Sequence, residues 1–128
     1  MPHHPNISGL TDAVQRYFDL MYDSDVSRFE RVFRPTAQLH GLRDGKLTML
    51  TADAFKALIA SRPSPKSVNA PREEEILLMD FASPTQALVK VRVRINTIVF
   101  VDYLTYHQVD GDWLITAKGY HVERMLAA

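Results

Sequence analysis

The chain contains no cysteine among its 128 residues. Without a thiol it has no disulfide, no thiolate nucleophile and no cysteine-ligated zinc site. It also lacks a surplus of charge, because fifteen basic residues balance fifteen acidic ones. Proteins that hold nucleic acid mainly through charge usually carry a basic surplus, so we expect no nucleic-acid partner.

Long hydrophobic runs are missing too, since no run approaches the roughly 20 residues of a membrane-spanning helix. The N-terminus, "MPHHPNISGL", lacks the basic and apolar regions of a signal peptide. At 46% hydrophobic residues, the chain is able to bury the core of one domain. We expect a flexible arm at residues 1–9, a single domain at residues 10–128, a cytoplasmic location and no membrane partner.

The first half of the chain has a helical pattern with one short hairpin. Apolar residues recur at helical spacing in "LTDAVQRYFDLMYDSD" (10–25) and "VSRFERVF" (26–33), and Pro35 ends the second helix. Short strands are predicted at 37–42 and 46–50 around an Asp44-Gly45 turn, followed by a helix at 52–61 capped by Thr51. The proline-rich stretch 62–72 is a loop, either a lid over a pocket or a plain connector.

The second half changes to the alternating pattern of strands. Four segments, "EEILLMDF", "QALVKVRVRI", "TIVFVDYLTYHQV" and "DWLITAKGYHV", are separated by turns at residues 83–84, 96–97 and 110–111. Three helices followed by long strands predict an α+β fold, with the helices on one face of a strongly bent mixed or antiparallel sheet.

Asp102 is out of place in this pattern. Counting back from the turn at residues 110–111 puts Asp102 opposite Gly119, on an apolar face that it shares with His121 and the Tyr106 hydroxyl. No cation is expected on that face, and a carboxylate buried without a partner raises its pKa. This predicts a cavity with a carboxyl group in its wall.

Asp102 could also be an ordinary part of the core. Loop amides could satisfy the carboxylate, or it could form a simple pair with His121. A β-bulge would reverse the alternation and place Asp102 beside Lys118 as a salt bridge.

Two stretches carry a resemblance to a known superfamily: "AVQRYFDLMYDSDVSRFERVFRPTAQLHG" and "VDYLTYHQVDGDWLITAKGYH". Together with the order of the elements, residues 8–124 resemble the NTF2-like superfamily, which includes nuclear transport factor 2, ketosteroid isomerase and the polyketide cyclases. The sequence of these stretches is most similar to a bacterial subgroup catalogued as "putative lumazine-binding". The resemblance implies a cystatin-like, cone-shaped fold that binds a small, mostly apolar ligand.

The resemblance also implies site residues. Ketosteroid isomerase forms an oxyanion hole from a first-helix tyrosine and a protonated strand aspartic acid, positions that Tyr17 and Asp102 match. Its general-base carboxylate is missing here, where "FRPTAQLHG" offers His40. We expect Tyr17 and Asp102 to donate hydrogen bonds to a carbonyl or enolate, and His40 or His121 to move the proton. The expected apolar walls are Phe18, Met21, Phe55, Phe100, Tyr106 and Trp113.

The missing base leaves three interpretations open: an acid/base isomerase, dehydratase or cyclase, a binding protein without chemistry, or a structural protein whose cone is filled. The histidines lack metal-ligand spacing and there is no phosphate-binding glycine loop, so we expect no metal and no cofactor. The other face of the sheet carries an apolar band that predicts a homodimer; it includes Val99, Val101, Tyr103 and Tyr120.

Overall fold

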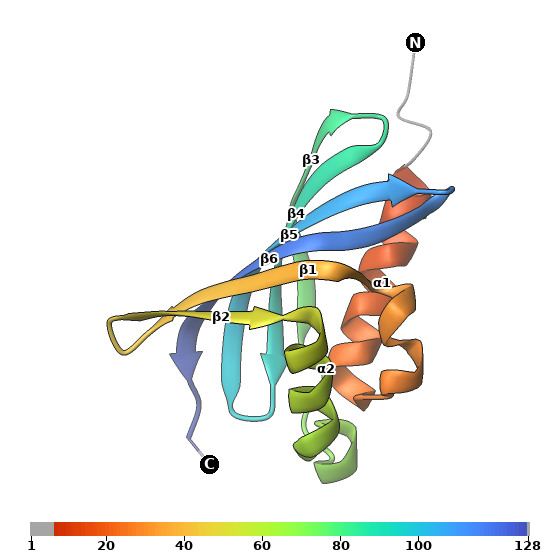
Figure 1. Ribbon diagram of the computed structural model, residues 1–128. Coiled ribbons are helices and arrows are strands. Elements are labelled where there is room, and N and C mark those ends of the chain that lie inside the picture. Colours follow the sequence, from red (N-terminus) through yellow and green to blue (C-terminus); the bar gives the residue numbers. More distant parts are fainter. Residues whose placement is uncertain (1–6, 128) are drawn as a thin grey trace.

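The structure, a computed structural model, describes residues 7–127 and is an α+β fold in which the helices cover one face of a six-stranded sheet (Figure 1). The strand order is β2-β1-β6-β5-β4-β3. This confirms the predicted fold class. The elements run α1 (Ile7–Asp23), η1 (Val26–Arg31), β1 (Phe33–Arg43), β2 (Lys46–Thr51), α2 (Ala52–Ser61), η2 (Lys66–Val68), β3 (Glu74–Ser83), β4 (Gln86–Ile95), β5 (Ile98–Val109) and β6 (Asp112–Met125).

Helix α1 starts at Ile7, so residues 7–9 of the predicted arm are helical, while residues 1–6 lie outside the described part of the chain. Its apolar stripe faces the sheet, as the helical spacing indicates. No helix within residues 7–127 is long and apolar enough to cross a membrane. The buried residues of α1 are Leu10, Ala13, Val14, Tyr17, Phe18, Leu20 and Met21.

The sheet is mixed because β1 pairs in parallel with β6, whereas the other neighbours are antiparallel. Strand β1 begins at Phe33, four residues before the predicted start, and the preceding helix is a short 3-10 helix that ends at Arg31. Pro35 therefore lies inside the strand. It sits where the pairing with β6 is interrupted between Phe33 and Gln38, at a position where a residue without an N–H group is tolerated.

The predicted turns are present. Asp44, Asn96 and Asp110 adopt positive φ at three of the four hairpin turns, and Gly45 and Gly111 follow two of them with positive φ. The fourth, between β3 and β4, lies at residues 84–85, one residue after the predicted position. Thr51 caps α2 as predicted, because its hydroxyl accepts a hydrogen bond from the backbone N–H of Ala54 at 3.1 Å.

A β-bulge in β6 corrects the predicted register. Thr105 pairs with Ala117 but Tyr106 pairs with Ile115, so one residue of β6 is extra. Beyond the bulge Asp102 lies opposite Tyr120, one residue away from the predicted partner. A shift of one residue exchanges the two faces of a strand. Lys118 consequently points toward the helices, and His121 points to the outer face.

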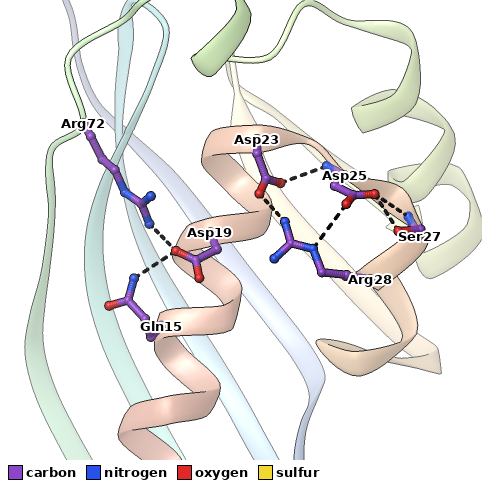
Figure 2. Close-up of polar contacts among 7 residues, drawn as sticks. All are labelled: Gln15, Asp19, Asp23, Asp25, Ser27, Arg28 and Arg72. Carbon is purple, nitrogen blue, oxygen red and sulfur yellow. Dashed lines mark hydrogen bonds and ion pairs between the residues drawn. The ribbon is translucent and has the colours of Figure 1, made fainter.

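Ion pairs fix the segments around the C-terminal end of α1. Figure 2 shows Arg28 of η1 reaching Asp23 and Asp25, and Arg72 reaching Asp19 of α1. Arg72 belongs to the proline-rich segment 62–72, which the Tyr22 hydroxyl also holds by donating to the carbonyl of Ala70 at 3.1 Å. The end of this loop is thus attached to the C-terminal half of α1.

Candidate functional site: a cavity beneath helix α2

A cavity of about 110 Å³ lies between α2 and strands β1, β2, β4, β5 and β6. Within residues 7–127 its wall is mostly apolar and carries three cationic side chains but no carboxylate. We call it the α2 cavity. It is lined by Leu39, Arg43, Leu50, Phe55, Leu58, Arg62, Ile95, Phe100, Lys118 and Tyr120.

Helix α2 supplies one wall through side chains spaced at three and four residues. Phe55, Leu58 and Arg62 follow this spacing, which keeps them on one side of the helix. Arg62 is the C-terminal cap of the helix and the first residue of the loop 62–72, so the loop contributes to the rim of the cavity.

The opposite wall depends on a glycine in β1. Gly41 is buried and pairs with Tyr120 of β6. A Cβ atom at Gly41 would overlap the Tyr120 ring, so the absent side chain is what lets the ring lie in the wall. The Tyr120 hydroxyl is in contact with the Thr48 hydroxyl of β2.

Lys118 is the most deeply buried cation of the cavity, with only 5% of its side chain exposed. Its Nζ lies 4.6 Å from the centre of the Phe55 ring and 5.1 Å from that of the Tyr17 ring. Both are favourable cation–π distances. Burial lowers the pKa of the Lys118 ammonium, the charge of Asp102 raises it, and Arg62 lowers it further.

Asp102 lies directly behind Lys118, away from the cavity wall, and is 1% exposed. Tyr17 donates its hydroxyl hydrogen to Oδ2 at 2.5 Å, and the Lys118 Nζ stands 3.8 Å from the same oxygen. The expectation that no cation shares this face is therefore wrong. The second carboxyl oxygen, Oδ1, is buried and has no hydrogen-bond partner among residues 7–127.

The pKa shifts of Asp102 and Tyr17 keep the tyrosine hydroxyl as the hydrogen-bond donor. Burial raises the pKa of Asp102 above its ordinary value, while Lys118 and the Tyr17 hydrogen bond pull it down. Burial and the neighbouring Asp102 raise the pKa of Tyr17 well above its ordinary range, so its hydroxyl stays protonated. Because the two side chains bond each other, the hydrogen that Tyr17 would offer a ligand is already donated to Asp102.

The predicted apolar walls are divided between cavity and core. Phe55 and Phe100 line the α2 cavity. Four others are buried elsewhere in the core and do not line it: Phe18, Met21, Tyr106 and Trp113. Tyr106 and Trp113 keep buried polar atoms, the hydroxyl and Nε1, that have no hydrogen-bond partner within the described chain.

The two predicted proton-transfer histidines lie on the outer face. His40 is exposed between the buried residues Leu39 and Gly41, as alternation in β1 requires. His121 is exposed and pairs with Val101. The prediction that Asp102 and His121 are neighbours on one face is wrong, because the bulge turns His121 outward. Neither histidine lines the α2 cavity.

The sequence did not lead us to Arg62, and it suggested Lys118 only as a salt-bridge partner of Asp102 in the case of a β-bulge. A signal for Arg62 was present, since it continues the α2 stripe by one turn beyond Leu58. No group of three His, Asp or Glu residues within residues 7–127 is placed to hold a metal ion.

Comparison with known proteins supports the fold. The family model described as "Putative lumazine-binding" matches residues 5–121. An NTF-2 like protein of unknown function from Silicibacter pomeroyi is 25% identical, with a TM-score of 0.80 over 96% of this chain and 100% of that one. No curated protein matches the chain.

Two further solved structures share the fold at lower identity. An NTF2-like protein of unknown function from Shewanella baltica is 20% identical, with a TM-score of 0.81 over 97% of this chain and 98% of its own. A ketosteroid isomerase-like protein from Erwinia carotovora atroseptica is 10% identical, with a TM-score of 0.74 over 95% and 99% of the two chains. At these identities the likeness carries the fold alone.

Proposed function

We propose that this chain, which belongs to the family described as "Putative lumazine-binding" within the NTF2-like superfamily, binds a small ligand with an apolar body in the α2 cavity. The observation that carries the proposal is a mostly apolar cavity that keeps a buried ammonium, Lys118, in its wall. Ligand sites in proteins have this composition: apolar walls with a few placed polar groups.

The size of the cavity limits the enclosed part of a ligand to one aromatic ring at most. An apolar protein cavity of about 150 Å³ accepts benzene, and the α2 cavity has about 110 Å³. Leu58 is 41% exposed at its rim, so the cavity reaches the surface and leaves room for a substituent that extends into solvent.

Fluorine NMR with small fluorinated aromatic probes, neutral and anionic, tests this proposal. Leu58→Trp should block the cavity from its rim and abolish saturable binding of every probe. Leu58→Met, a change of similar volume, is the matched control and should keep it. If no probe binds the wild-type protein, or if Leu58→Trp binds as well as wild type, the cavity is not the binding site, and a protein with a closed cone is the better account.

Acid/base chemistry on the bound ligand is a second candidate, favoured by Oδ1 of Asp102, which has no partner within residues 7–127. In this mechanism the uncharged amine of Lys118 takes a proton from the carbon next to the ligand's carbonyl and the resulting ammonium returns it, while Asp102 behind it stabilises the ammonium. Such a step predicts deuterium exchange at carbon next to the carbonyl of a small ketone in heavy water. The exchange should be slowed by Asp102→Asn, and its absence from the wild-type protein would leave binding as the whole function.

We also propose that two copies pair through the outer face of the sheet, which no helix of the described chain covers (Figure 1). Large apolar side chains remain exposed there, and a patch of this kind usually contacts a partner. Val99 and Val101 are already buried within one chain, and Tyr120 points into the cavity instead. The candidate contacts are therefore Leu42, Leu47, Met49 and Tyr103.

The oligomeric state checks this pairing. Sedimentation equilibrium should give twice the chain mass for the wild-type protein and a single chain mass for Tyr103→Lys. Val68→Lys, a substitution at an exposed residue of η2, should leave the dimer intact. A wild-type monomer would refute the pairing.

A further inference from the structure

We infer that the ligand of the α2 cavity is an anion, with a carboxylate or similar oxyanion that binds between Arg62 and Lys118. The inference rests on the proposed function, because it names the chemical class that the same cavity selects. Its evidence is separate, however, and lies in the charges of the cavity and in their missing partners.

Arg62 is a cation whose buried donors are unpaired. Its Nε and one terminal nitrogen, Nη2, are buried and have no hydrogen-bond partner within residues 7–127. A guanidinium offers these N–H groups as a planar fork that matches a carboxylate. Leaving buried donors of a charged group unpaired is costly, so the pair of nitrogens is suited to an acceptor from outside the chain.

Lys118 has a counter-ion but keeps donors to spare. Asp102 is 3.8 Å from its Nζ, which is beyond hydrogen-bond distance. An ammonium has three N–H donors. The oxygen nearest the ammonium, Oδ2, already accepts the Tyr17 hydrogen bond, and burial raises the pKa of the carboxyl group, so Asp102 compensates the ammonium incompletely.

The electrostatic balance of the cavity favours an anion. Arg43, Arg62 and Lys118 line it, and the lining that residues 7–127 provide includes no Asp or Glu. Arg62 and Lys118 are close enough for Arg62 to lower the pKa of the lysine. An anion placed between them would relieve this repulsion, whereas a neutral ligand would leave it in place.

The remaining lining specifies what the anion is attached to. Phe55 and Phe100 stand on opposite elements, α2 and β5, and both contribute rings to the cavity wall. An aromatic or branched apolar body between them would bury its surface while its acidic group meets the two cations. The class is therefore a small aromatic or apolar carboxylic acid or a comparable oxyanion.

A pair of probes of equal size separates the charge from the body of the ligand. Fluorine NMR titrations would compare para-fluorobenzoate with para-fluorobenzyl alcohol at about pH 7 on the wild-type protein. The same titrations would be made on Arg62→Gln, which removes the charged fork and leaves a shorter, uncharged polar side chain. Arg34→Gln is the matched control, because Arg34 does not line the cavity.

We expect the wild-type protein to bind the benzoate at least about tenfold more tightly than the alcohol, as for hydrogen bonds to a charged group. Arg62→Gln should remove most of this preference, and Arg34→Gln should keep it. Equal affinity for both probes would overturn the anion inference and leave ligand binding standing. No binding of either probe would overturn the proposed function, and the inference with it. A preference that survives Arg62→Gln would also overturn the assignment to Arg62.

Discussion

At the scale of single residues, Asp102 shows how a strand holds a carboxyl group on its buried face. The carboxyl group receives the Tyr17 hydrogen at 2.5 Å and stands 3.8 Å from a lysine ammonium. These two contacts offset part of the desolvation of the charge. Tyr17 is 85 residues away on α1, and Lys118 faces Asp102 only because of the bulge in β6, which is why alternation along β5 alone identified the burial of Asp102 but not its partners.

The titration of Asp102 is the first prediction at this scale. Because burial dominates, carbon-detected NMR should give a carboxyl pKa above the ordinary value of 3.8. Tyr17→Phe and Lys118→Met each remove an influence that lowers this pKa, so both should raise it further. A value at or below 3.8 in the wild-type protein would contradict this account of the site.

The direction of the shift fixes its effect on stability. A carboxyl group whose pKa is higher in the folded than in the unfolded protein contributes its stabilisation below the unfolded value. That contribution is lost as the pH rises through the folded value. Asp102 therefore favours folding most in acid and least at neutral pH.

Gly41 carries the second prediction. In Gly41→Ala the new methyl group would overlap the Tyr120 ring and push it from the cavity wall. Overpacking of this kind costs about 1–3 kcal/mol, and binding of para-fluorobenzoate should weaken. Gly119→Ala is the matched control, since its Cβ would meet nothing closer than 4.0 Å. Thermal unfolding and fluorine NMR give the two readouts; an unaffected Gly41→Ala protein would refute the close packing.

At the scale of elements, local signals predicted what is local. The apolar stripe of α1, the Thr51 cap and the glycine-containing turns are set by neighbours within a few residues, and the structure has each of them. The bulge in β6 depends on long-range pairing: β6 lies between antiparallel β5 and parallel β1. No residue of "DWLITAKGYHV" indicates the position of a bulge. Simple alternation of side chains along β6 therefore placed Lys118 and His121 on the wrong faces.

Helix α1 offers a test of packing at this scale. Leu10 is completely buried, whereas Ile7 on the same helix is 47% exposed. Leu10→Ala should lower the free energy of unfolding by about 2–5 kcal/mol. Ile7→Ala should change it by less than about 0.5 kcal/mol. Chemical denaturation measures both, and equal losses would mean that α1 packs on the sheet in another way.

At the scale of the whole molecule, the sheet and helices form a cone whose interior is not uniform. Near Trp113 the interior is packed, because the indole is buried and the Phe81 ring centre lies 6.1 Å from it. The end beneath α2 keeps the cavity with its cations. The resemblance seen in the sequence is confirmed for the fold. It did not predict the cavity chemistry, because Arg62 lies outside both stretches that carry the resemblance and Lys118 depends on the bulge.

The central claim is that Arg62 and Lys118 hold an anion in an apolar cavity, and a crystal structure of the protein soaked in para-fluorobenzoate tests it most directly. We expect density for the ring between Phe55 and Phe100, with the carboxylate within hydrogen-bond distance of Arg62 and of the Lys118 Nζ. A cavity closed by its own side chains, or benzoate bound only elsewhere, would contradict the claim.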